Sequence, residues 1–314
     1  MHPTQSGMPP AIRGALWGLT AVMIWGCYLA FTRAGVSGGQ APADLAFLRF
    51  ATAGLMLLPW LLRHAPLRAA GIGWRRALVL TLLAGPPFIL VGAAGFQFAP
   101  LAHGAVVQPA SLTLGGVLLG AWVLKDRLTR NRVLGVALIV AGLGCVAGPG
   151  LLLGGPTALI GDALFATAGL MWAVFAVLQR RWSVEPLAAT AVVSVLSLIV
   201  YAPAYLVLRG PAALLTLPAG TLAMQIIVQG VLSGVVAVFA FGRAVQLLGP
   251  ARAAVFPALV PGVAILIGIP ITGELPLAVQ VSGLVIVTLG LLITQIRHLP
   301  RGVTALRRPL PNPA

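Results

Sequence analysis

Ten long apolar segments follow one another along the chain, separated by short gaps rich in proline, glycine or arginine. They span residues 13–35, 43–62, 76–99, 102–124, 132–149, 157–180, 186–208, 218–247, 250–272 and 276–297. A helix needs about 20 mostly apolar residues to cross the hydrocarbon core of a bilayer. Because only 8% of the residues are charged, against about 25% in soluble domains, the chain suits lipid rather than water. We therefore expect an all-α polytopic membrane protein with ten transmembrane helices.

The basic residues gather at alternate gaps between these segments. If the N-terminus is inside the cell, seventeen of the twenty basic residues lie at inner ends, Arg33 and Arg209 lie at outer ends, and Arg49 lies within a span. Loops that stay in the cytoplasm carry the excess of Lys and Arg. This predicts that the tails 1–12 and 298–314 are both cytoplasmic, in a bacterial inner membrane.

The net charge of +15 raises the question of nucleic acid as a partner. The charges are spread over the gaps, with no interleaved aromatic residues and no recognisable nucleic-acid module, so we expect no nucleic-acid binding. Both cysteines, Cys27 and Cys145, lie inside apolar segments and predict neither a disulfide nor a metal site. The expected partners are the lipid bilayer and a small-molecule substrate, with no cofactor. The oligomeric state stays open and is compatible with a monomer.

The second half of the chain repeats the first at a shift of 148 residues. Comparing residues 105–143 with 253–291 gives ten identities in 39 positions, and Asp126 falls opposite Glu274. The identical positions in the first copy are Ala105, Val107, Pro109, Ala110, Leu118, Gly120, Val133, Gly135, Gly142 and Leu143. Both prolines, three glycines and an acid in register indicate an internal duplication.

Each copy contains five of the ten apolar segments, the first copy in 13–149 and the second in 150–297. Because five is odd, the second copy enters the membrane from the side opposite to the first. The two halves should then be inverted repeats, related by a pseudo-two-fold axis in the membrane plane. This architecture recurs in secondary transporters, whose substrate sites lie near mid-membrane between the halves.

Each copy also resembles the pattern of the EamA family in the drug/metabolite transporter superfamily. The first copy has Trp25-Gly26 in its first span, the run 105–110 in its fourth and Asp126 at the end of that span; the second copy has Trp172-Ala173, 253–258 and Gly273-Glu274, and departs from the pattern at Ala173 and Pro276. The resemblance implies a ten-helix exporter with a central cavity. Within the family, the chain is most similar to bacterial exporters of aromatic and neutral amino acids of the YddG type.

Several spans contain prolines that a simple lipid-facing helix would not need. These candidate helix breaks or gating points are Pro86, Pro87, Pro109, Pro257 and Pro261. Each proline removes a backbone donor and disturbs the preceding turn, so polar backbone groups are freed. In lipid, such groups must be satisfied by neighbouring helices, by water or by a ligand. Plain kinks sealed by neighbouring helices and breaks that line a cavity both remain open.

Aromatic and polar side chains within or bordering the spans are candidates for a substrate cavity. They are Trp25, Tyr28, Arg49, Phe88, Gln97, His103, Gln108, Trp172, Phe175, Gln229 and Phe256. Aromatic faces would hold an apolar side chain, while amides would hold an amino acid's charged ends. The alternatives are helix packing for the tryptophans, interhelical hydrogen bonding for the amides, snorkelling for Arg49 and an exposed cap for His103.

These features predict a secondary transporter that exports small metabolites, foremost aromatic or other neutral amino acids, by alternating access. Another carrier of the same fold, for a sugar, a nucleotide-linked metabolite or a drug, is the first alternative. An intramembrane lipid enzyme would need a Ser/His, HExxH or paired-carboxylate constellation, and the sequence has none, so we expect no enzymatic activity. Because no acid lies at mid-span, facilitated export is favoured over proton-driven export, and coupling stays open.

Overall fold

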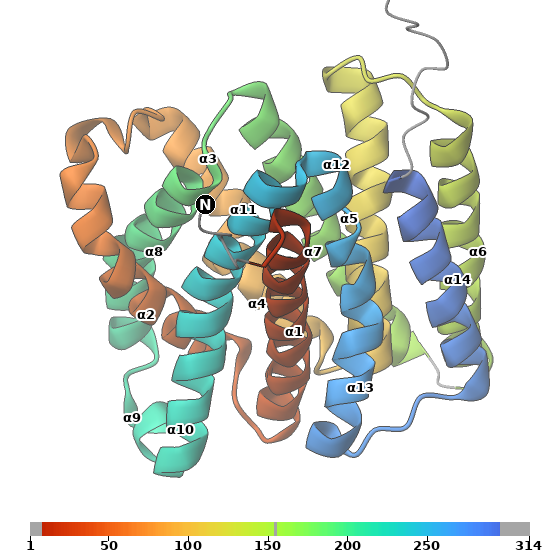
Figure 1. The fold of residues 1–314 in the computed structure, drawn as a ribbon. Coiled ribbons are helices and arrows are strands. Elements are labelled where there is room, and N and C mark those ends of the chain that lie inside the picture. Colours follow the sequence, from red (N-terminus) through yellow and green to blue (C-terminus); the bar gives the residue numbers. More distant parts are fainter. Residues whose placement is uncertain (1–7, 154–155, 296–314) are drawn as a thin grey trace, which may run out of the picture.

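The computed structural model describes residues 8–153 and 156–295, which form a bundle of helices (Figure 1). The predicted tails therefore lie outside the described residues, apart from residues 8–12. The helices of the first half are α1 (Pro10–Ser37), α2 (Pro42–Arg63), η1 (Pro66–Arg68), α3 (Trp74–Ala84), α4 (Pro86–Gly95), α5 (Leu101–Val123) and α6 (Arg130–Leu153).

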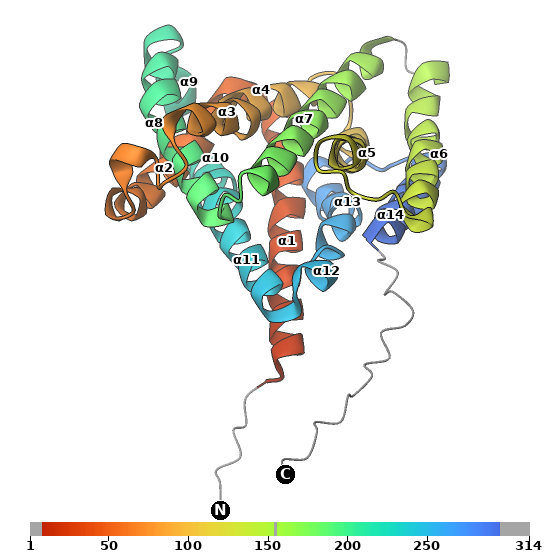
Figure 2. The same ribbon diagram turned by 90° about the horizontal axis from the view of Figure 1, so that it is seen from above.

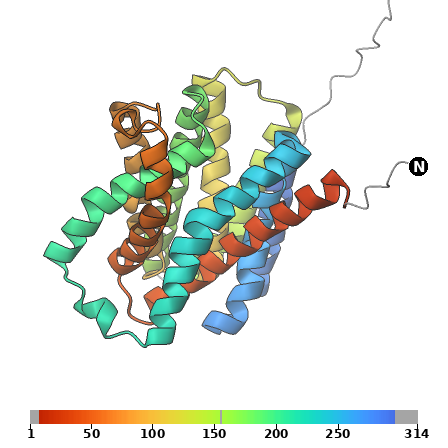
Figure 3. The ribbon, with the colours of Figure 1, turned by 60° about the vertical axis from the view of Figure 1, so that its left-hand side comes forward.

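The second half repeats this order with a few more interruptions. Its elements are α7 (Pro156–Arg181), α8 (Pro186–Leu208), α9 (Ala212–Leu215), α10 (Ala219–Gln225), η2 (Ile226–Val236), α11 (Ala237–Leu248), α12 (Pro250–Ala253), η3 (Phe256–Leu259), α13 (Val260–Thr272) and α14 (Ala278–Gln295). The segment η2 is a π-helix that runs without a break from α10 into α11. Figure 3 shows this long rod running alongside α1.

Within the described residues, eight helices are long and apolar enough to cross a membrane, and Phe256–Thr272 forms a shorter apolar helix. The protein is therefore an all-α, multi-pass membrane protein. The ninth apolar segment, expected as one span over 250–272, is instead divided into α12, η3 and α13. Pro257 and Pro261 explain the division, because neither can donate to the preceding turn.

The helix ends alternate between the two ends of the bundle. In the orientation of Figure 1, the start of α1, the end of α14 and the connections α2–α3, α5–α6, α7–α8 and α11–α12 all lie at the upper end. The connections α1–α2, α4–α5 and α13–α14 lie at the lower end. The basic gaps identified in the sequence thus share one end of the molecule.

Helices α6 and α14 lie side by side (Figure 2), and glycines from both copies of the repeat form their contact. A Cβ added at Gly135 would lie 2.7 Å from the Gly290 carbonyl oxygen, and one at Gly142 would lie 2.8 Å from that of Gly283. The helices are therefore antiparallel and their backbones touch, as small residues allow in lipid. At the shift of 148 residues, Gly135 aligns with Gly283 and Gly142 aligns with Gly290. The contact of Gly135 with Gly290 is therefore the repeat equivalent of the contact of Gly142 with Gly283.

The other main packing pairs also join one half to the other. Helix α2 packs on α8, α5 packs on α7, and α1 packs on α11 and α13. The pairs α1–α13 and α5–α7 correspond to each other under the repeat, as do α1–α11 and α7–α4. The apolar core consequently lies along the seam between the halves.

Asp44 fixes the start of α2 against α8. Its carboxylate accepts hydrogen bonds from the Ala41 backbone N–H, the Tyr205 hydroxyl at 2.7 Å and the Arg209 Nε at 2.6 Å. These contacts with Asp44 raise the pKa of the Arg209 guanidinium. One of the two basic residues predicted at the outer ends is thereby neutralised.

Candidate functional site

Arg49 of α2 points into the bundle and joins three helices. Its Nη1 donates a hydrogen bond to Ser233 Oγ of η2 at 2.6 Å. The guanidinium carbon also lies 5.1 Å from the centre of the Tyr28 ring of α1 and 5.9 Å from that of Phe50. Cation–π contacts at such distances stabilise a desolvated guanidinium.

Arg49 has no carboxylate within ion-pair distance in the part of the chain that the structure describes. All five acids fall in that part: Asp44 pairs with Arg209, Asp126 with Arg180, Asp162 with His103 and Glu274 with Arg33, while Glu185 is exposed before α8. A cation in a membrane-spanning segment is costly unless it has a partner. A guanidinium has five N–H donors in a planar fork that fits a carboxylate, so Arg49 suits an anionic ligand.

An aromatic wall formed by Phe88, Trp172 and Phe175 belongs to the same apolar cluster as Tyr28 and Phe50. The Phe88 and Trp172 rings are 4.9 Å apart, and the Trp172 and Phe175 rings are 5.1 Å apart. The wall combines α4 of one half with α7 of the other. It offers flat apolar faces in the same cluster as Tyr28 and Phe50, the two rings that the Arg49 guanidinium contacts.

The helix break at Gly85 positions this wall. Helix α3 ends at Ala84 and α4 begins at Pro86, so Phe88 lies in the first turn of a new helix. A Cβ at Gly85 would collide with the Thr81 carbonyl oxygen and lie 3.0 Å from Ser197 Oγ. At a shift of 148 residues, Gly85 aligns with Ser233 and Arg49 aligns with Ser197. The contact between Arg49 and Ser233 therefore corresponds to the contact between Ser197 and Gly85 in the other copy of the repeat. Only one of the two corresponding contacts carries a charge.

Gln108 of α5 lies beside the aromatic wall. A Cβ at Gly92, one turn after Phe88, would lie 3.7 Å from Gln108 Oε1. A Cβ at Gly169, three residues before Trp172, would collide with the Gln108 carbonyl oxygen. The amide therefore sits where α4, α5 and α7 meet. Helix α5 continues unbroken through Pro109.

A family comparison accounts for both halves of the bundle. The family model described as "EamA-like transporter family" matches residues 12–148 and, a second time, residues 159–296. The chain belongs to this family. It is accordingly a membrane transporter with two EamA domains, and it is not an enzyme.

Two further similarities agree with the EamA assignment. The "Uncharacterized transporter YyaM" of Bacillus subtilis (strain 168) is 25% identical over 264 residues, which cover 81% of this chain and 85% of that protein. A solved structure titled "Crystal structure of protein" matches with a TM-score of 0.60 at 20% identity, and the match covers 89% of this chain and 95% of that one. The latter similarity shows a shared fold.

In this EamA protein, Gln229 belongs to an amide network between η2 and α1 rather than to the Arg49 cluster. Its Nε2 donates to Thr32 Oγ1 at 3.0 Å and to Gln225 Oε1 at 3.2 Å, and Gln225 in turn donates to Gln40 Oε1. Gln229 is completely buried, and its Oε1 has no hydrogen-bond partner among the described residues. The network holds a π-helix, a rare structure that often lies at functional sites.

Four other predicted residues of the EamA protein have described contacts elsewhere in the bundle. Gln97 is exposed beyond the end of α4. His103 is buried at the start of α5 against Asp162 and Gln280. Phe256 packs against Gly18 of α1, and Trp25 packs against Phe241 at 5.5 Å. The central cluster thus retains Tyr28, Arg49, Phe88, Gln108, Trp172 and Phe175.

Proposed function

We propose that this EamA protein is a secondary transporter that exports small metabolites carrying a carboxylate and an apolar group, foremost aromatic or other neutral amino acids. The observation that carries the proposal is Arg49, a cation inside the bundle that has no carboxylate partner in the described part and contacts Tyr28 and Phe50, which share an apolar cluster with the aromatic wall. Such a cation is retained at a cost because a substrate carboxylate can neutralise it.

Each part of such a substrate has a counterpart in the cluster. The carboxylate would lie on the Arg49 guanidinium, with the Ser233 hydroxyl holding that guanidinium in place. The apolar side chain would lie against Phe88, Trp172 and Phe175. The ammonium group would meet the Gln108 amide oxygen, since no carboxylate of the chain is available there.

Transport would proceed by alternating access between inverted halves, with both termini in the cytoplasm of a bacterium. Two features support this proposal. The shift of 148 residues exchanges the glycine contacts between α6 and α14. The basic connections share the end of the bundle at which α1 begins and α14 ends (Figure 1). The N-terminal half would rock against the C-terminal half around Arg49.

The Arg49 cluster also bears on the other solute classes that this fold could carry. A sugar offers no charge for Arg49, and the phosphates of a nucleotide-linked metabolite would call for more than one deep basic residue. A cationic drug would meet like charge at Arg49 and no compensating acid within the cluster. Because Arg49 is the one guanidinium of the cluster, the cluster favours a substrate that carries one carboxylate.

Reconstitution in liposomes tests the proposed function directly. Purified protein should accelerate the flux of radiolabelled phenylalanine, leucine or threonine well above that of empty liposomes. Phenylalaninol, which lacks the carboxylate, should compete poorly with phenylalanine, whereas phenylpyruvate, which lacks the ammonium, should compete better than phenylalaninol. Flux equal to that of empty liposomes across such a panel would refute the proposal.

A further inference from the structure

A buried imidazole links the two halves of the protein at the end where α5 begins. His103 of α5 is 2% exposed. Its Nδ1 lies 2.8 Å from Asp162 Oδ1 of α7, and its Nε2 lies 3.1 Å from Gln280 Nε2 of α14. One residue of the first half is thus held by two residues of the second.

The orientation of the Gln280 amide indicates which nitrogen of His103 accepts a hydrogen bond. Gln280 Oε1 accepts a hydrogen bond from the Leu277 backbone N–H at 2.9 Å, so the amide NH2 group must face the imidazole. The NH2 group can only donate, and Nε2 must therefore accept and carry no proton. The imidazole proton then lies on Nδ1 and is donated to Asp162. In this arrangement His103 is neutral.

The charges around His103 do not balance. Asp162 Oδ2 is buried and has no hydrogen-bond partner among the described residues. The two other charged pairs at this end are complete: Asp44 pairs with Arg209, and Glu274 accepts from Arg33 Nε at 2.6 Å and from the Leu101 backbone N–H at 2.7 Å. Helix α13, which also packs on α5, has no ionisable side chain in its sequence. The Asp162 carboxylate is left as an excess negative charge in a poorly polarisable environment.

A proton on His103 Nε2 would remove this imbalance and break the link to α14. An imidazolium beside Asp162 forms a neutral pair, and histidine is the side chain that gains and loses a proton near neutral pH. The new N–H would, however, face the NH2 group of Gln280, and two donors cannot bond to each other. Proton binding would therefore release α5 from Gln280.

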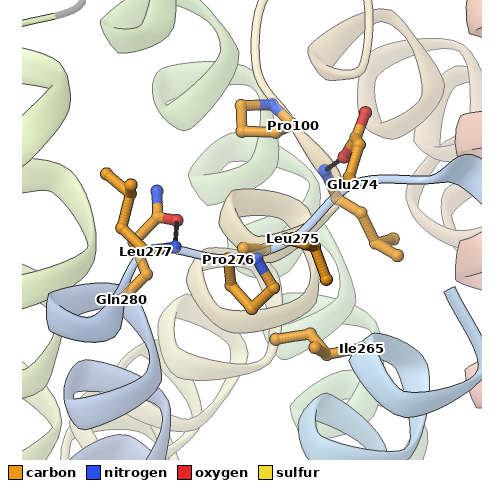
Figure 4. Close-up of a pocket in the computed structure, with 9 residues that line it drawn as sticks. Pro100, Ile265, Glu274, Leu275, Pro276, Leu277 and Gln280 are labelled. Atoms are coloured by element: carbon orange, nitrogen blue, oxygen red, sulfur yellow. Dashed lines mark hydrogen bonds between the residues drawn. The ribbon is translucent and has the colours of Figure 1, made fainter. Parts of the chain in front are cut away.

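A cavity borders Gln280, the α14 partner of His103, and the residues that precede His103 in the chain. Its volume is about 300 Å³, and it is lined by Pro100, Leu101 and Ala102 of the α5 start and by Glu274, Leu277 and Gln280 from α14 and the loop before it (Figure 4). Releasing Gln280 would loosen the packing of the loop before α14 against the start of α5.

From these contacts, we propose that His103, Asp162 and Gln280 form a proton-binding site that couples substrate export to proton entry. In each cycle, one proton would bind Nε2 from the cavity side, the halves would rearrange, and the same proton would leave on the other side in exchange for one substrate molecule. The inference rests on the proposed function, since it needs a transported substrate. The sequence alone favoured facilitated export, because no acid lies at mid-span, and left coupling open.

The first test measures protons and substrate in the same liposomes. With pyranine trapped inside, a phenylalanine gradient should move protons in the opposite direction through the wild-type protein. His103→Gln should keep phenylalanine counterflow at equal pH within about twofold and lose the proton movement. The matched control, His64→Gln, alters an exposed histidine stacked on Trp60 and should behave as wild type. Wild-type counterflow without proton movement, or unchanged proton movement in His103→Gln, overturns the coupling site. Absence of any wild-type counterflow refutes the proposed function instead.

The second test does not depend on transport. In full-length protein labelled with 15N-histidine and held in nanodiscs, the His103 signal, assigned by its loss in His103→Gln, should show the Nδ1–H tautomer at high pH. Gln280→Glu, which can accept from Nε2–H, should place a proton on Nε2 under the same conditions. An Nε2–H tautomer in the wild-type protein, or an unchanged tautomer in Gln280→Glu, overturns the proposal.

Discussion

The Arg33 guanidinium donates to the Glu274 carboxylate at 2.6 Å and joins the end of α1 in one half to the loop before α14 in the other. Between the two copies of the repeat, Arg33 aligns with Arg180 at a shift of 147 residues, and Asp126 aligns with Glu274 at a shift of 148. Arg180 donates to both oxygens of Asp126, at 2.7 and 2.8 Å. In Figure 1 the end of α1 and the loop before α14 lie at the lower end of the bundle, and the end of α7 and the loop after α5 lie at the upper end. The two corresponding ion pairs therefore lie at opposite ends.

The two ion pairs differ in how deeply they are enclosed. The Arg33 side chain is 19% exposed, and it also donates to the Phe96 carbonyl oxygen, so it ties α1 to the segment between α4 and α5. The Arg180 side chain is 60% exposed. The end with Arg33 is consequently fastened by more buried contacts than the end with Arg180.

Removing the Glu274 charge should open the end of the bundle at which it lies. In a background with Cys27 and Cys145 replaced by alanine, a cysteine at Ala102, which is 7% exposed, should react with a water-soluble maleimide several times faster when Glu274→Gln is present. The double replacement Arg33→Glu with Glu274→Arg should restore slow labelling. Asp126→Asn, at the other end, should not accelerate it, and equal acceleration by both single replacements would contradict independent closure of the two ends.

Ser233→Ala should weaken substrate binding without unfolding the protein. The hydroxyl that orients the Arg49 guanidinium is lost, and hydrogen bonds to charged groups contribute about 1.5–3 kcal/mol. The KM for phenylalanine should rise by about tenfold or more, with a smaller change in kcat. Ser233→Thr keeps the hydroxyl and should recover most of the affinity. An unchanged KM in Ser233→Ala would show that the orientation of Arg49 is irrelevant to transport.

Trp172→Ala should discriminate among substrates by their side chains. Loss of the ring that contacts both Phe88 and Phe175 should reduce phenylalanine flux by about tenfold and threonine flux much less. Trp122→Ala is the matched control, because Trp122 is 74% exposed on α5 and faces away from the cluster. Equal losses of phenylalanine flux and threonine flux would show that the aromatic wall is not part of the substrate site.

Gly142→Ala should destabilise the contact between α6 and α14. The added methyl group would lie 2.7–2.9 Å from Val287 and the Gly283 carbonyl oxygen, and overpacking of this kind costs about 1–3 kcal/mol. Gly144→Ala, on the same helix with nothing within 4 Å, should leave the melting temperature in detergent unchanged or slightly raised. Similar melting temperatures for the two variants would contradict the antiparallel glycine contact.

The sequence predicted the helical class and the transporter family because both depend on local patterns. Long apolar segments and repeated motifs are visible without knowing which helices meet, and the family match confirms two EamA domains. The glycines that revealed the duplication, such as Gly135 and Gly283, proved to be the residues at which the halves touch.

The partners of individual side chains could not be predicted in the same way. Arg49 and Ser233 are 184 residues apart, and His103 and Gln280 are 177 apart. Their contacts depend on how the faces of different helices meet, which a single sequence does not record. The π-helix over Ile226–Val236 could not be predicted either, since its apolar sequence would equally suit an α-helix; in the structure its Gln229 bonds to Thr32 of α1.

Direct binding of phenylalanine to the purified protein tests the central claim, that Arg49 receives the substrate carboxylate. Isothermal titration should show binding to the wild-type protein and to Arg63→Gln, in which an exposed arginine of the same helix is replaced. Arg49→Gln should bind at least about thirtyfold more weakly, because truncating one partner of a buried charge pair costs about 2–5 kcal/mol or more. Equal affinities in Arg49→Gln and Arg63→Gln would contradict the account.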